Sequence, residues 1–145
     1  MGYSENQVRQ WYKNLGLPFP EKKPNAKTSE NGDGMNKTER RYSEHLESLK
    51  AAGEIVWFKF GCLSLKLAKA THYRPDFLVV MADGSIQIHE VKGAKKDANG
   101  NPGFYAREDS WLKIKIVSEM YPCFVFKIVF PAGRQWREKV IASLS

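Results

Sequence analysis

The feature that most constrains the fold is a pair of strand-like runs on either side of one turn signal. Residues 73–80 and 85–92 are rich in β-branched and aromatic residues, as is typical of β-strands. Between the runs stands Asp83-Gly84, which is among the strongest signals for a tight hairpin turn. The sequence therefore predicts that the two runs pair as antiparallel neighbours and form a central hairpin.

The hairpin brings two acids and a base together. A turn at this signal pairs positions whose numbers sum to about 167, so Asp76 is expected opposite Val91 and next to Glu90 and Lys92. Glu90 and Lys92 share one face of their strand, because side chains alternate between faces. Pro75 fixes its own φ and removes one ladder donor just before Asp76. We expect all three charged groups to meet at the end of the hairpin.

This combination is suited to phosphodiester hydrolysis. Two carboxylates can hold a hard divalent cation such as Mg²⁺, which keeps several of its waters, and the carbonyl of Val91 can add a ligand. One or two such ions neutralise the charge that develops at phosphorus. A lysine beside the cation can orient or deprotonate a water. Asp76 and Glu90 are therefore candidate metal ligands, and Lys92 is a candidate catalytic residue.

Glu39 is a third candidate acid with two open interpretations. Asn36 can cap a helix, and Glu39 stands at the third helical position, as in a capping box. It also lies on the apolar stripe of that helix, three residues before Tyr42, so it is expected to face the body of the protein. The two roles are compatible, because a glutamate in the first turn can bond locally and still reach a metal ion.

The remaining runs predict an α/β (α+β) domain preceded by an arm. Residues 20–35 are polar and rich in Pro and Gly, which predicts a flexible linker, so residues 1–35 form the arm and residues 36–145 the main domain. The expected element order of the domain is α-β-β-β-α-β-α. The expected pieces are helices from Ser4 to Leu15, from Asn36 to Gly53, over 105–121 and over 134–143; strands over 55–60, 62–67 and 124–130; and a mobile basic loop over 93–103.

Composition limits the class of protein. A chain of 145 residues predicts one domain, and a net charge of +7 with a pI near 9.4 weakly favours a polyanionic partner over a merely basic surface. Cys62 and Cys123 lie in apolar runs, so we expect two buried thiols in a reducing, cytoplasmic compartment. No run approaches about eighteen consecutive apolar residues, so no membrane span is expected.

Together these motifs resemble the PD-(D/E)XK nuclease superfamily, and within it phage endonucleases similar to endonuclease I-type Holliday-junction resolvases. The resemblance covers about residues 36–130. Its motifs are Asn36-Lys37-Thr38-Glu39, residues 72–77, Glu90-Val91-Lys92-Gly93, residues 112–115 and Tyr121-Pro122.

The resemblance implies a restriction-endonuclease-like core, which is a central mixed sheet flanked by helices. It implies Mg²⁺, with Mn²⁺ able to substitute. Asp76 and Glu90 would be the metal ligands, Lys92 the catalytic lysine and Glu39 the family's helical acid. The implied activity is cleavage of branched or duplex DNA in the cytoplasm of a phage host. Junction cleavage requires two cuts, which predicts a homodimer.

Five basic residues are candidate phosphate contacts, although each can equally be a solvated surface charge. They are Arg74, Lys95, Lys96, Arg107 and Lys113. The alternative hypotheses are a non-catalytic nucleic-acid-binding protein and a host-interaction protein on the same fold. The complete set of Asp76, Glu90 and Lys92 favours the enzyme, because a protein that only binds has no use for that combination.

Overall fold

The computed structural model describes residues 4–16, 19 and 33–141, and the chain divides into two compact units, residues 1–34 and 35–145. The first unit contains helix α1 (Glu5–Asn14). The Ser4 side chain accepts a hydrogen bond from the Gln7 N–H, and the Gln7 side chain bonds the Ser4 backbone. This capping box begins the helix at the residue that the sequence predicts. Most of the predicted linker, residues 20–32, lies outside the described residues.

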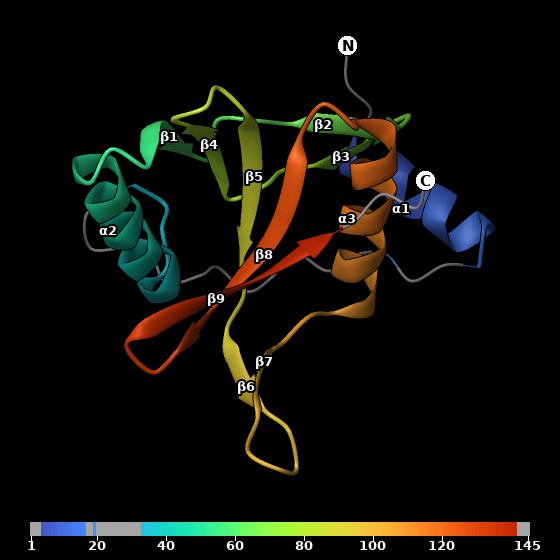
Figure 1. The fold of residues 1–145 in the computed structure, drawn as a ribbon. Helices are drawn as coiled ribbons and strands as arrows, with labels where there is room; N and C mark the ends of the chain where they lie inside the picture. The colour runs from blue at the N-terminus through green and yellow to red at the C-terminus, as the bar shows by residue number, and fades with distance from the viewer. Residues whose placement is uncertain (1–3, 17–18, 20–32, 142–145) are drawn as a thin grey trace. The chain divides into compact units, whose positions relative to one another are not determined.

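The second unit is built on a mixed five-stranded sheet with the strand order β1-β4-β5-β8-β9 (Figure 1). β1, β4 and β5 form an antiparallel meander, β8 runs parallel to β5 after the crossover through α3, and β9 returns antiparallel to β8. The bounds are β1 (Ile55–Phe60), β4 (Phe77–Met81), β5 (Ile86–Val91), α3 (Glu108–Met120), β8 (Val125–Ala132) and β9 (Gln135–Ile141). The predicted α+β class with a mixed sheet is confirmed.

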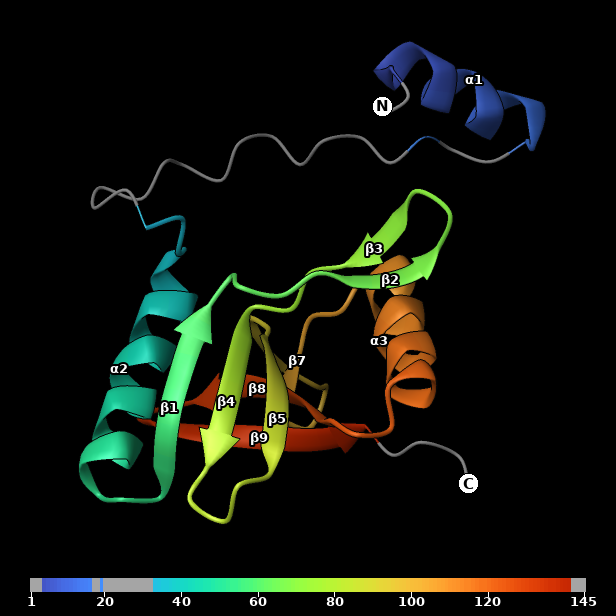
Figure 2. The same cartoon turned by 90° about the horizontal axis from the view of Figure 1, so that it is seen from above.

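The two faces of the sheet carry separate hydrophobic cores, and a helix covers each (Figure 2). On one face, Ile114 and Val117 of α3 pack with Ile88 of β5. On the other, Leu46 of α2 (Lys37–Ala51) packs with Val91 of β5. The alternation of side chains along β5 therefore sends the Ile88 and Glu90 positions toward α3, and the Val91 position toward α2.

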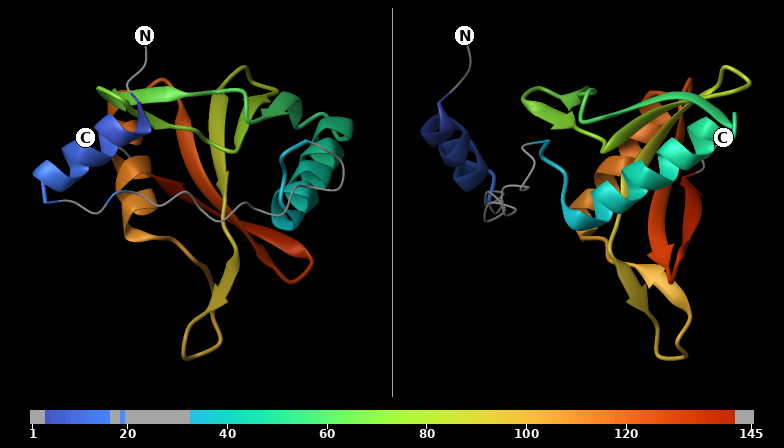
Figure 3. Two further views of the ribbon diagram at one scale, coloured as in Figure 1. Left: turned by 180° about the vertical axis from the view of Figure 1, so that it is seen from behind. Right: turned by 90° about the vertical axis from the view of Figure 1, so that its left-hand side faces the viewer.

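Two small hairpins flank this sheet. β2 (Leu65–Ala68) pairs with β3 (Thr71–Tyr73), and the Tyr121 hydroxyl at the end of α3 donates to the carbonyl of Lys66 at 2.8 Å. β6 (Ala94–Lys96) pairs with β7 (Pro102–Phe104) and projects from the end of β5 (Figure 3). No helix in the described part of the chain is long and apolar enough to cross a membrane.

The predicted closing helix over residues 134–143 is wrong, because residues 135–141 form strand β9. The segment contains Arg, Glu and Lys, which favour helices, but a two-residue connection joins it directly to β8. Gly133 has φ +66° in the first position of that connection, where hairpin turns commonly place glycine. Pairing with β8 along its length then overrides the weak helical preference of the segment.

Three further expectations need correction. The loop over 93–103 is a hairpin whose turn is held by Asp97, which accepts hydrogen bonds from the Asn99 and Asn101 N–H groups. The expected continuous strand 73–80 is broken between Tyr73 and Phe77, where Pro75 cannot donate to a ladder. The two cysteines are exposed rather than buried, since each lies in a connection just outside a strand.

Candidate active site

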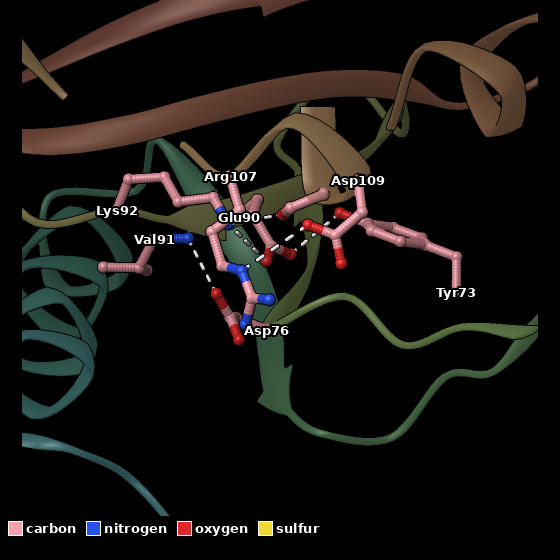
Figure 4. A network of polar contacts seen from close by, with 8 residues as sticks. Tyr73, Asp76, Glu90, Val91, Lys92, Arg107 and Asp109 are labelled. Atoms are coloured by element: carbon pink, nitrogen blue, oxygen red, sulfur yellow. Dashed lines mark hydrogen bonds and ion pairs between the residues drawn. The ribbon is translucent and has the colours of Figure 1, made fainter. Parts of the chain in front are cut away.

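The central hairpin forms as predicted, with its register one residue from the expected one. Phe77 pairs with His89, so Asp76 is placed where β4 begins and β5 ends. The Asp76 carbonyl accepts from the Gly61 N–H at 2.8 Å, and its carboxylate Oδ2 accepts from the Val91 N–H at 2.8 Å (Figure 4). Pro75 before it is buried. The aspartate is therefore fixed through both its backbone and its side chain.

The Glu90 carboxylate lies between the hydroxyl of the buried Tyr73 and the ammonium of Lys92. Its Oε2 accepts a hydrogen bond from the Tyr73 hydroxyl at 2.8 Å. Its Oε1 lies 3.5 Å from Lys92 Nζ, and the two side chains are only 14% and 17% exposed. Such limited exposure reduces solvent screening, so these groups interact strongly with one another and with any ion that enters.

Lys92 is held from two directions. Its N–H donates to the carbonyl of Val129 on β8 at 2.9 Å. Its Nζ donates to Ser110 Oγ in the first turn of α3 at 2.8 Å. An ammonium has three protons to donate, so beyond the contacts with Ser110 and Glu90 it retains donor capacity for another group.

The carboxylates place excess negative charge in a partly dry environment. Burial, followed by the charge of Glu90 and more weakly that of Glu39, raises the pKa of Asp76 to about 8, against the lowering effects of the Val91 N–H and the Lys92 ammonium. Burial also raises the pKa of Tyr73, followed by the charge of Glu90 and its hydrogen bond. A bound cation would relieve this repulsion, since opposite charge favours the ionised carboxylate.

The available donors fit a hard, partly hydrated cation better than a fully protein-coordinated one. Within the described residues, no group of three or more His, Cys, Asp or Glu side chains is placed to hold a metal ion. Asp76 and Glu90 offer only oxygen ligands, the type that Mg²⁺ prefers while keeping several waters. The pair therefore fits Mg²⁺, which does not require a complete cage of side chains.

Glu39 forms the predicted capping box: its Oε2 accepts from the Asn36 N–H at 2.7 Å, and its own N–H donates to Asn36 Oδ1 at 2.9 Å. Its charge also acts on Asp76, so the two are near enough to interact electrostatically. The Val91 N–H donates to the Asp76 carboxylate, and the Val91 side chain is buried against α2. The metal-binding roles of Glu39 and of the Val91 carbonyl stay predictions.

The candidate phosphate contacts are exposed and are spread over several elements. Arg107 is the residue before α3, where its Nε lies 3.6 Å from Asp109 Oδ1 (Figure 4). The others are Arg74 between β3 and β4, Lys95 and Lys96 on β6, and Lys113 on α3. Arg74 is closest in sequence to residues that form the site, and contact of any of the five with DNA stays a prediction.

Sequence reasoning missed two residues of this network, Tyr73 and Ser110. Tyr73 reads as a core aromatic next to a strand, and at 6% exposure it is one, but its hydroxyl reaches Glu90 only because β3 folds beside the site. Ser110 has no motif spacing to Lys92, since α3 brings it there through the tertiary fold. No local signal links Tyr73 to Glu90 or Ser110 to Lys92.

No protein-family model matches the chain, and no curated protein or solved structure matches it either. The functional assignment therefore depends on the geometry of the site.

Proposed function

We propose that the protein is a Mg²⁺-dependent DNA endonuclease of the PD-(D/E)XK type. The observation that carries the proposal is the meeting of Asp76, Glu90 and Lys92 where β4 begins and β5 ends. The mixed sheet between α2 and α3 supports it, because the sequence resemblance implies such a core. Mn²⁺ is expected to substitute for Mg²⁺.

A divalent cation on Asp76 and Glu90 would supply Lewis-acid stabilisation of the charge that develops at phosphorus. The chain's own residues would position the attacking water, the phosphate and the metal ligand Glu90. Lys92 Nζ is steadied by Ser110 and directs its remaining donor capacity at the attacking water or a phosphate oxygen. Tyr73 holds one oxygen of Glu90 and leaves the other facing Lys92. Groups fixed in this way lower the cost of aligning water and phosphate.

The substrate class in this proposal is DNA, branched or duplex. The net charge of +7 and the exposed basic residues around the site support a polyanionic partner. Cleavage of a four-way junction would need two such sites, hence a homodimer of the 16.6 kDa chain. The cytoplasm of a phage host is the setting that the resemblance implies.

Cleavage assays with matched variants test the proposal. A four-way junction, a flap, a nicked duplex and a linear duplex are incubated with Mg²⁺, Mn²⁺ or EDTA. We expect wild-type cleavage with either metal and none in EDTA. Lys92→Ala should lower the rate by about 10²–10⁴-fold, and Asp76→Ala should abolish cleavage while DNA binding persists.

Glu44→Ala, which removes an exposed acid from α2, serves as the matched control and should cleave like wild type. If wild-type protein cleaves none of the four substrates with either metal, a non-catalytic binding role replaces the enzyme. Equal cleavage by wild type and Asp76→Ala would show that the activity comes from elsewhere.

A further inference from the structure

A pocket of about 350 Å³ lies where the β6–β7 hairpin meets α3 and β9. Its volume falls within the range of about 300–1,000 Å³ that is typical of small-ligand sites. Two lysines and three aromatic residues dominate its wall, and no acidic residue contributes to it. The lining residues are Lys95, Phe104, Tyr105, Ala106, Trp111 and Lys139.

The pocket combines aromatic rings with positive charge. Lys95 Nζ lies 5.5 Å from the centroid of the Tyr105 ring, and Lys139 Nζ lies 5.0 Å from that of Trp111. Tyr105 is 62% exposed, so most of its side chain is accessible from solution. An open aromatic ring in a pocket that two ammonium groups also line suits a nucleotide, since the base can stack on the ring while the phosphate meets the lysines.

The backbone ties this pocket to the catalytic lysine. The Tyr105 N–H donates to the carbonyl of Gly93, the residue after Lys92, at 3.1 Å. Trp111 directly follows Ser110, which holds Lys92 Nζ. A DNA strand whose scissile phosphate lies at Lys92 would therefore present a neighbouring nucleotide to the pocket.

We propose that this pocket binds one unpaired nucleotide of the DNA substrate, with its base stacked on Tyr105 and its phosphate near Lys95 and Lys139. The inference rests on the proposed nuclease function and adds its substrate preference. A base inside a duplex is stacked and paired, so it enters a side pocket only when it is unpaired or extruded. The protein consequently favours DNA with an unpaired nucleotide next to the cleaved bond.

Binding in EDTA tests the pocket separately from catalysis. The ligands are a fluorescein-labelled single-stranded thymidine oligonucleotide, a copy with abasic positions, and a blunt duplex of equal length. Tyr105→Ala should weaken binding of the thymidine strand by about 5- to 150-fold, the equivalent of ~1–3 kcal/mol per stacked base. Tyr105→Trp should restore it, and the abasic strand should bind wild type and Tyr105→Ala equally.

Val56→Ala, at an exposed apolar position on β1, is the control and should bind all three ligands like wild type. Equal binding of the thymidine strand by wild type and Tyr105→Ala would overturn the proposal, and so would equal losses for the thymidine and abasic strands. If cleavage is observed with Mg²⁺ but Tyr105→Ala binds the thymidine strand normally, the proposal for the pocket is wrong and the proposed nuclease function is kept. If Tyr105→Ala binds the thymidine strand more weakly but no substrate is cleaved, the proposal for the pocket is kept and the proposed nuclease function is wrong.

Discussion

At the scale of single residues, the site depends on neutral partners as much as on charged ones. The sequence alone predicts that Asp76, Glu90 and Lys92 meet, because a turn signal and strand alternation are local properties of the chain. It does not reveal Tyr73 or Ser110, whose hydroxyls reach the site from β3 and α3. Partners brought together by tertiary packing have no fixed spacing, so pattern reasoning cannot find them.

Tyr73→Phe tests whether the phenol positions Glu90. The change removes one hydrogen bond to a carboxylate, an interaction worth about 1.5–3 kcal/mol, while Glu90 keeps its contact with Lys92. We expect kcat for DNA cleavage to fall about tenfold or more, a higher Mg²⁺ concentration to be needed for half-maximal rate, and KM for DNA to change little. Steady-state cleavage at several Mg²⁺ concentrations measures all three.

Tyr121→Phe is the matched control, because it removes a hydroxyl that bonds the Lys66 carbonyl away from the carboxylates. It should leave the kinetics and the Mg²⁺ dependence unchanged. If Tyr73→Phe behaves like this control, or if only its thermal stability drops, then the phenol is a packing residue and does not tune the site.

At the scale of elements, the sequence predicts pieces whose cause is local and misses those set by partners. The helix begun by Asn36 and the hairpin around Asp83-Gly84 follow from caps and turns that neighbouring residues supply. β9 was missed because its strand character comes from pairing with β8, from Phe126 opposite Ile141 to Ala132 opposite Gln135. The Gly133 turn is the local signal that could have revealed it.

Gly133→Ala tests that turn. At φ +66° a Cβ clashes with its own backbone, at a cost of about 1–2 kcal/mol, and no atom beyond Gly133 and its two chain neighbours lies within 4 Å of the added carbon. We therefore expect the free energy of unfolding, from urea denaturation, to fall by that amount through backbone strain alone. Gly103→Ala, where φ is not in the left-handed region, should lose clearly less. Equal losses would show that the turn is not what sets β9.

The packing of α2 against β5 predicts an acid sensitivity. His89 is 5% exposed, and its ring bonds the Tyr42 hydroxyl through Nδ1 and the Gln87 side-chain oxygen through Nε2. Burial, followed by the positive charges of Lys127 on β8 and His45 on α2, lowers its pKa to about 3. The folded protein therefore keeps this imidazole neutral where an unfolded chain would protonate it.

The sign follows from proton linkage. Between about pH 6.5 and pH 3 the unfolded chain binds a proton at residue 89 that the folded chain refuses, so acid removes stability, by up to ~1.4 kcal/mol per pH unit. His89→Gln should be less stable than wild type at pH 7 but should lose less on acidification to pH 4. His72→Gln, at an exposed position on β3, should follow wild type. The free energy of unfolding is measured by urea denaturation at pH 7 and at pH 4. If it falls by the same amount in wild type and His89→Gln, then His89 is not the source of the acid sensitivity.

At the scale of the whole molecule, the net charge of +7 bears on which kind of partner the protein binds. Composition predicts a polyanionic partner only weakly, because solvated lysines are common on any surface. The structure adds their positions: Lys96 on β6 and Lys113 on α3 are both exposed, on elements that follow β5 in the chain. If both contact phosphates, each releases counterions when DNA binds.

Salt dependence then measures these contacts. The affinity for a fluorescein-labelled duplex is determined by anisotropy in EDTA between 50 and 200 mM salt, so that no cleavage intervenes. Each phosphate contact contributes about −0.9 to the slope of log K against log salt, so Lys96→Ala and Lys113→Ala should each make the slope shallower by about that amount. Lys50→Ala, at the far end of α2 from Glu39, should keep the wild-type slope. A wild-type slope in Lys96→Ala or Lys113→Ala would remove that lysine from the interface, and a flat slope for wild type would exclude an electrostatic DNA contact altogether.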